Sequence, residues 1–235
     1  MYRLIIKKSV LIVFLSYILP IYAQSSAQIA EFAKAAKFDD LTQVRALITS
    51  GMDPNSVDLK GDPMLVIAIR DKSSKVTEYL LNNKQIDVDL SNKLGETPLM
   101  LAAIDGDLPL VKRLVLKNKA QIDHIGWTPL LYACSKGRLE VAQFLVSNGA
   151  DVNALSPNGS TPIMLAAQSG NELLVKYLLD QGADIRIRNS LGLSVIDIAE
   201  IYQKPWIAKG LQSRWLKLYK EPYVGPQTNT LNQPS

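Results

Sequence analysis

The chain has 235 residues, of which 47% are apolar and 20% charged, and this composition excludes an intrinsically disordered chain. It contains one cysteine, Cys134, and one histidine, His124. These counts exclude an intramolecular disulfide and a four-ligand zinc site built from Cys and His.

The first 23 residues have the layout of a secretory signal peptide. Three basic residues are followed by an uncharged, mainly apolar run at residues 10–22 and then by Ala23. The run is short for a membrane-spanning helix, which needs about 20 residues. We therefore expect a signal peptide at residues 1–23 and a periplasmic or secreted protein. Cleavage after Ser25 or Ala27, and an uncleaved membrane anchor, are alternatives.

Removal of this segment takes away its three basic residues and lowers the formal net charge of the chain from +4 to +1. The basic balance of the full sequence therefore does not indicate a nucleic-acid partner.

The chain from residue 24 onward is a tandem repeat. Residues 95–103, 126–134 and 159–167 read GETPLMLAA, GWTPLLYAC and GSTPIMLAA. Each stretch is followed three residues later by Gly, and the Pro residues, counted from Pro63, lie 35, 31 and 33 residues apart. A period of this length predicts stacked units that share one continuous core.

Each copy of the motif predicts a pair of helices. The Thr can cap the first helix, the Pro suits its first turn, and Gly106, Gly137 and Gly170 suit the left-handed turn that ends it. The small pair that precedes each Gly lets the helices of neighbouring units approach closely. Cys134 replaces Ala in one of these pairs, so we expect it to be buried and unreactive.

This pattern resembles the ankyrin repeat, whose signature is Thr-Pro-Leu-His-x-Ala, over about residues 27–217. The resemblance implies an all-α solenoid of about six helix-turn-helix units with β-hairpin-like fingers. The unit that starts at Gly95 is two residues short, and we place the loss near residues 121–125. The signature His is replaced by apolar residues, which must pack in its place: Leu65, Met100, Leu131 and Met164.

The last unit departs from the pattern after Pro205. A following segment places Trp206, Ile207 and Trp215 at helical spacing, which is typical either of a cap on the preceding unit or of a partner-binding helix. We assign residues 24–217 to the array and predict a flexible tail at residues 218–235.

The sequence offers little chemistry. His124 is interpreted as a polar loop residue, and no second His is present to share a metal or a proton relay. There is no glycine-rich phosphate loop and no calcium-loop spacing. We therefore predict no catalytic residue, metal, cofactor or small-molecule substrate, and a protein as the partner, with a membrane involved only if the N-terminal segment is retained.

The resemblance implies a binding surface made of finger tips and first helices. Trp127 is the first choice, because Trp is enriched among interface anchors, although its ring could instead pack on the shortened finger. Three of the apolar candidates, Phe38, Ile69 and Ile104, lie in one row along the first helices and could form an apolar strip. The candidates are Phe38, Ile69, Arg70, Ile104, Trp127, Lys136, Leu155, Arg186 and Arg188. The predicted function is an exported protein-interaction module. An inhibitor or immunity-type binder of an exported enzyme or toxin, and a membrane-anchored scaffold, are the alternatives.

Overall fold

The computed structural model describes residues 25–226. The predicted signal peptide at residues 1–23 lies outside the described residues, as does the end of the chain from residue 227. The helices are α2 (Ser26–Lys37), α3 (Leu41–Thr49), α4 (Met64–Arg70), α5 (Ser74–Asn82), α6 (Pro98–Asp105), α7 (Leu108–Lys112), the π-helix η1 (Arg113–Lys117), α8 (Pro129–Ser135), α9 (Leu139–Ser147), α10 (Pro162–Ser169), α11 (Glu172–Asp180), α12 (Val195–Ile201) and α13 (Pro205–Tyr219).

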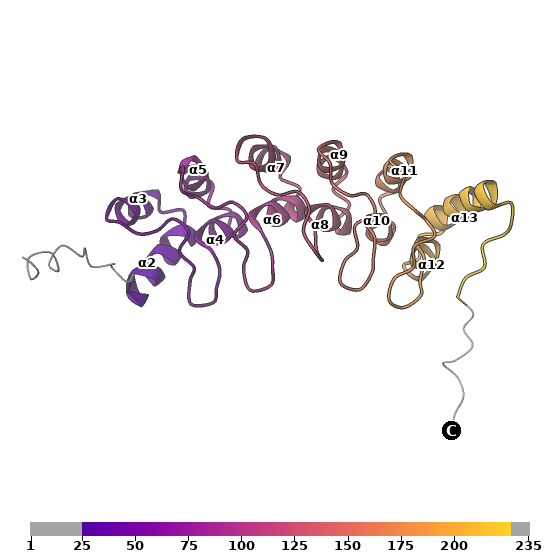
Figure 1. The fold of residues 1–235 in the computed structure, drawn as a ribbon, viewed down its shortest axis with the longest axis horizontal. Coiled ribbons are helices and arrows are strands. Elements are labelled where there is room, and N and C mark those ends of the chain that lie inside the picture. The colour runs from indigo at the N-terminus through magenta and orange to yellow at the C-terminus, as the bar shows by residue number, and fades with distance from the viewer. Residues whose placement is uncertain (1–24, 227–235) are drawn as a thin grey trace, which may run out of the picture.

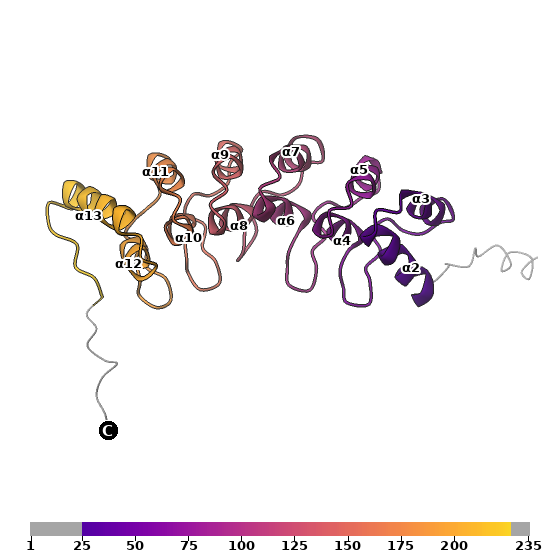
Figure 2. The ribbon, with the colours of Figure 1, turned by 180° about the vertical axis from the view of Figure 1, so that it is seen from behind.

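The helices form successive pairs that stack into an elongated array (Figure 1). The first helices of the pairs (α2, α4, α6, α8, α10 and α12) form one row and the second helices form a row beside it. The loops between units, here called fingers, project from the other side of the first-helix row, as the view from behind also shows (Figure 2). The predicted all-α solenoid is confirmed. No helix between residues 25 and 226 is long and apolar enough to cross a bilayer.

The motif residues begin and end the first helices as predicted in most copies. The Thr97 and Thr128 hydroxyls accept hydrogen bonds from the backbone N–H of the residue three positions later, at 3.3 and 3.2 Å. Gly106 ends α6 in the left-handed conformation, at φ 80°, where a side chain would be strained. Thr161 differs, because its buried hydroxyl has no hydrogen-bond partner among the described residues.

The core runs along the array between the two rows of helices. The small pairs, such as Ala166 and Ala167, are fully buried, and so is Cys134, as predicted. Burial raises the pKa of the Cys134 thiol and keeps it protonated. The side chains that replace the signature His are buried as well, so apolar packing does substitute at Leu65, Met100, Leu131 and Met164.

The fingers are hairpin-like, although the described residues contain only an isolated bridge between Val57 and Pro63 rather than a strand. Each full-length finger is closed by a backbone hydrogen bond between residues four apart, and a Gly with positive φ lies just before the closing carbonyl. The closing N–H groups are those of Asp58, Asn92, Ser156 and Asn189.

The third unit carries the irregularity that the sequence indicates, but in a different form. Its second helix runs from α7 into the π-helix η1 and is one residue longer than the nine-residue α9 and α11. Its finger is correspondingly shorter: Lys117 and Pro129 are 12 positions apart, whereas Ser147 and Pro162 are 15 apart. A π-helical turn accommodates one inserted residue, so the finger loses three residues rather than two.

The C-terminal cap corrects the predicted boundary at residue 217. Helix α13 has 15 residues and continues to Tyr219, and it buries Ile207 and Leu211 against the last unit. The chain then returns, and the Tyr223 ring packs edge-on against Trp215 with centroids 5.1 Å apart. Residues 218–226 are therefore part of the cap and not of a free tail.

Candidate functional site

The shortened third finger carries Trp127 close to the start of α8. Its side chain is 38% exposed, and its ring packs on Tyr132 with centroids 5.2 Å apart. The Tyr132 hydroxyl donates a hydrogen bond to Oε1 of Glu96 at 3.1 Å. Trp127 is therefore partly exposed and also held in place, and the contact that holds it is made by α8 rather than by the finger.

A polar network extends this contact into the second finger. Burial and the neighbouring Glu96 carboxylate raise the pKa of Tyr132 to about 12, so the phenol stays protonated and remains a donor. The other carboxylate oxygen of Glu96 accepts a hydrogen bond from the buried Asn92 side chain at 2.8 Å. Asn92 also accepts from the backbone N–H of Leu94 at 2.9 Å. The second and third fingers are thus linked into one surface.

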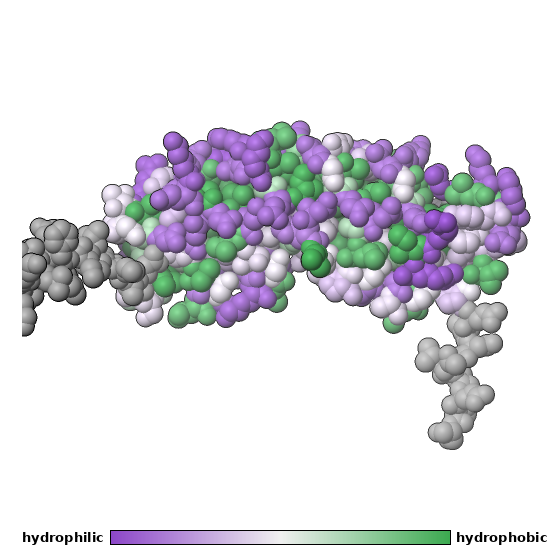
Figure 3. Space-filling model, in the orientation of Figure 1, coloured by the Kyte–Doolittle hydropathy of each residue, from purple (hydrophilic) through white to green (hydrophobic). Residues whose placement is uncertain are grey.

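Exposed aliphatic side chains at the finger tips are a feature that the sequence reasoning missed. They are each at least 77% exposed, and green side chains are visible at the lower edge of the array, where the fingers end (Figure 3). The available signal was an aliphatic residue one or two positions before the finger Gly in four of the five fingers. We call this set the fingertip row: Leu59, Leu94, Ile125 and Leu191.

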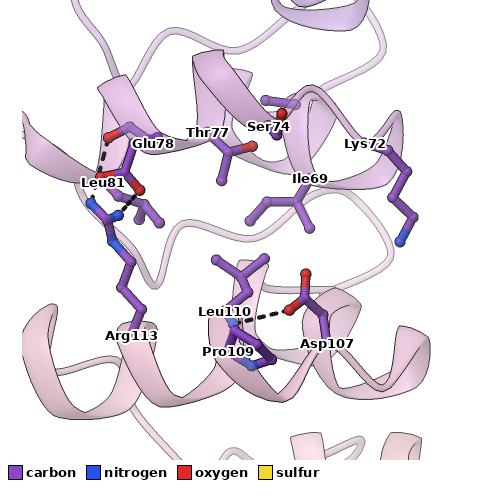
Figure 4. A pocket seen from close by; sticks show the side chains of 11 residues that line it. Ile69, Lys72, Ser74, Thr77, Glu78, Leu81, Asp107, Pro109, Leu110 and Arg113 are labelled. Atoms are coloured by element: carbon purple, nitrogen blue, oxygen red, sulfur yellow. Dashed lines mark hydrogen bonds and ion pairs between the residues drawn. The ribbon is translucent and has the colours of Figure 1, made fainter.

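The predicted apolar strip along the first helices is wrong. Ile69 is only 4% exposed, Ile104 is half-buried, and Phe38 is exposed beside the Lys37 ammonium, 5.6 Å from its ring centre. Ile69 lies in the last turn of α4, and its side chain lines a groove between α5 and α7 (Figure 4). It therefore exposes little surface to a partner.

The groove between α5 and α7 has a volume of about 520 Å³ and lies beside the π-helical turn. Helices α5 and α7 contact each other less than α3 and α5, α7 and α9, or α9 and α11 do. Arg113 spans the groove, pairing with the Glu78 carboxylate and donating to Oδ1 of Asn82 at 3.1 Å. Lys72 pairs with Asp105 at the other end. Because these rim charges are paired within the chain, the groove offers a ligand little free charge.

The four basic residues predicted to contact a partner are all exposed, but three of them form ion pairs or hydrogen bonds within the chain. Arg70 pairs with Asp62 at 2.8 Å, and Arg186 pairs with Asp184 at 2.7 Å, which lowers the pKa of Asp184. Arg188 donates to the Gly192 carbonyl at 2.8 Å. The remaining two candidates, Lys136 and Leu155, are exposed. The structure thus places Trp127, Leu155, Arg186 and Arg188 on the fingers, and Phe38, Arg70, Ile104 and Lys136 at the ends of first helices.

The sole His and the sole Cys of the chain do not form a reactive site with their neighbours in the described residues. The described residues contain no group of three or more His, Cys, Asp or Glu side chains placed to hold a metal ion. His124 lies in the third finger with Nε2 buried and without a hydrogen-bond partner, and Cys134 is enclosed in the core.

The family comparison covers most of the described chain. A family model described as "Ankyrin repeats (3 copies)" matches residues 32–125, 99–189 and 151–212. These overlapping matches extend from the middle of α2 into α13 and include every finger.

Individual relatives match about half of the chain. Ankyrin repeat and SAM domain-containing protein 6 of Rattus norvegicus is 38% identical over 125 residues, which are 52% of this chain and 13% of the relative. Protein phosphatase 1 regulatory subunit 27 of Mus musculus is 34% identical over 107 residues, 44% of this chain and 69% of the relative. An ankyrin repeat protein of Rickettsia bellii is 32% identical over 120 residues, 50% of this chain and 66% of the relative. The chain thus spans only a small part of the first of these proteins.

Proposed function

The chain belongs to the ankyrin-repeat family, whose fold is a non-catalytic interaction module, and on this premise we propose that it binds a partner protein through its fingers. The proposed contact surface consists of the second and third fingers, centred on Trp127 and Ile125, with the fourth finger beside them. One relative is named as a regulatory subunit of a phosphatase, which is consistent with a protein partner.

The observation that carries this proposal is the fixed position of Trp127. A partly exposed aromatic ring that is already held by Tyr132 and Glu96 loses little conformational freedom on binding. Trp is also among the residues most enriched at the energetic centres of interfaces. The nearby Ile125 side chain is fully exposed and adds apolar surface at the same finger.

Site-specific photocrosslinking tests the proposal. A photoreactive amino acid at Ile125 is expected to crosslink a specific partner in cells. Leu173 on α11 is the matched control, because it is also an exposed aliphatic residue but belongs to the second-helix row. Crosslinks from Leu173 and none from Ile125 would place the partner on the other side of the array and overturn the proposal.

We further propose that the protein is exported and acts in the periplasm or outside the cell. The support is the basic start, short apolar run and Ala23 of the N-terminal segment. Mass spectrometry of the purified protein is expected to find a new N-terminus close to residue 24. Recovery of intact Met1 in a membrane fraction would instead support the membrane-anchored scaffold.

A further inference from the structure

The C-terminal cap differs in charge from the rest of the array. Residues 25–200 carry 18 Lys and Arg against 21 Asp and Glu, whereas residues 201–226 carry five against one. Within residues 25–226, the excess of positive charge therefore lies on the C-terminal cap. Figure 3 shows hydrophilic side chains over this end of the array, and Figure 1 shows α13 lying at the end of the row.

One face of α13 points away from the array and carries these cations. Trp206, Lys209, Ser213 and Lys217 recur at intervals of three or four residues, so they share a face of the helix, and all four are exposed. The opposite face buries Ala208 and Leu211 against the last unit. We call the outward set, together with Lys220 just beyond the helix, the cap face.

The lysines of the cap face are free to meet a partner. No ion pair joins Lys209, Lys217 or Lys220 to an acidic side chain within residues 25–226. The arginine of the cap is engaged differently, because Arg214 donates to the Leu179 carbonyl at 3.3 Å. The unpaired positive charge of the cap is therefore carried by lysine ammonium groups rather than by an arginine guanidinium.

Exposed aromatic side chains border the same face. Trp206 is 74% exposed although it lies in the first turn of α13, and it takes no part in the core. Tyr202 and Ile201 are also exposed at the end of α12. Trp and Tyr are the residues enriched where a bilayer meets water, because one end of the ring is apolar and the other polar.

We infer that the cap face binds an anionic phospholipid surface, with the lysines at the headgroup phosphates and Trp206 at the interface. Lysine is depleted at protein–protein interfaces, whereas unpaired lysines near an anionic bilayer each add attraction. Peripheral binding generally needs two signals, and the cap face supplies apolar side chains and clustered positive charge. This position leaves the fingers free to bind a protein partner, and it does not depend on the function proposed for them.

Vesicle cosedimentation of the full chain tests the inference. We expect binding to phosphatidylcholine vesicles that contain phosphatidylglycerol, and weaker binding in high salt. The double variant Lys209→Ala/Lys217→Ala should bind roughly 30-fold more weakly, at about one kilocalorie per lysine. The control Lys75→Ala/Lys84→Ala removes two exposed lysines elsewhere and should bind like the wild type.

Three outcomes would overturn the inference. The first is equal binding to vesicles with and without phosphatidylglycerol, and the second is a cap-face double variant that binds like the control variant. In the third, duplex DNA or polyglutamate competes with the vesicles while Trp206→Ala leaves vesicle binding unchanged, which would indicate a general polyanion site. Support requires, in addition, a blue shift of tryptophan emission on vesicle binding that is lost in Trp206→Phe. Thermal unfolding of each variant verifies that it is folded.

Discussion

The Tyr223 hydroxyl donates a 2.5 Å hydrogen bond to Oδ2 of Asp197 and so joins the returning C-terminal segment to the first helix of the last unit. Asp197 is buried and also accepts from the Ser194 backbone N–H at 2.7 Å and the Ser194 hydroxyl at 2.8 Å. Its position is that of the signature His in the repeat pattern. In the last unit, therefore, a buried carboxylate occupies this position, and Tyr223 of the returning segment donates a hydrogen bond to it.

Tyr223→Phe should destabilise the cap. The change removes a hydrogen bond to a buried carboxylate, and such bonds to charged groups contribute about 1.5–3 kcal/mol. Urea unfolding should show a lower midpoint for Tyr223→Phe than for the control Tyr202→Phe, which changes an exposed tyrosine. Equal midpoints would show that Tyr223 does not hold the segment in place.

Cys134→Ser should lower the free energy of unfolding by about 1–3 kcal/mol, because a hydroxyl would be left in a tight apolar site. Cys134→Ala is the matched control, since Ala occupies this position in neighbouring units. A thiol reagent should label the native protein far more slowly than the urea-unfolded protein. Rapid labelling of the native protein would contradict the enclosed position of Cys134.

The fold was predictable because residues that favour the start and the end of a helix recur at the same positions in several units. The Thr-Pro start and Gly end of each first helix agree in several copies, and stacking follows from the small residues between them. Agreement between several copies does not reveal a local exception in one of them. The lost finger residues and the extra helix residue partly cancel in the length of the third unit, so the spacing of Pro98 and Pro129 could not separate them.

The surface was less predictable, because the exposure of a side chain depends on how neighbouring units are spaced. Ile69 occupies the same motif position as Ile104, yet Ile69 is buried whereas Ile104 is half-buried. The role of Tyr223 was also beyond sequence reasoning. Its partner Asp197 is 26 positions away, and nothing in the repeat pattern indicates a return of the chain.

Tyr132 should titrate well above an ordinary tyrosine. Its pKa is raised to about 12 in the folded protein, so the neutral phenol is favoured by folding. This contribution to stability is present below pH 10 and is lost as the pH rises from about 10 to about 12. In an ultraviolet titration, Tyr132→Phe should remove absorbance change near pH 12 but not near pH 10. Loss of the change near pH 10 instead would contradict the hydrogen bond to Glu96.

Trp127→Ala should weaken partner binding by about 2 kcal/mol or more if the ring is an interface anchor. Loss of the packing on Tyr132 should cost only about 0.5–1.5 kcal/mol of stability beyond the loss of buried area. Isothermal titration of the crosslinked partner measures the first effect and thermal unfolding the second. Leu173→Ala is the control for an exposed apolar residue outside the fingers. A large fall in melting temperature without a change in affinity would make Trp127 a structural residue.

Arg186→Ala and Arg188→Ala should have the same effect on association with an acidic partner but different effects on stability. Arg186 pairs with Asp184 on the surface, so Arg186→Ala removes a positive charge with little effect on the fold. Arg188 also holds the fifth finger through the Gly192 carbonyl, so Arg188→Ala should in addition lower stability.

Both variants should slow association with the partner at low salt and match the wild type at high salt, because rim charges act mainly on the association rate. Stopped-flow measurements should compare them with Lys176→Ala, which removes an exposed cation from α11. Association rates that match this control at low salt would place the partner away from the fifth finger.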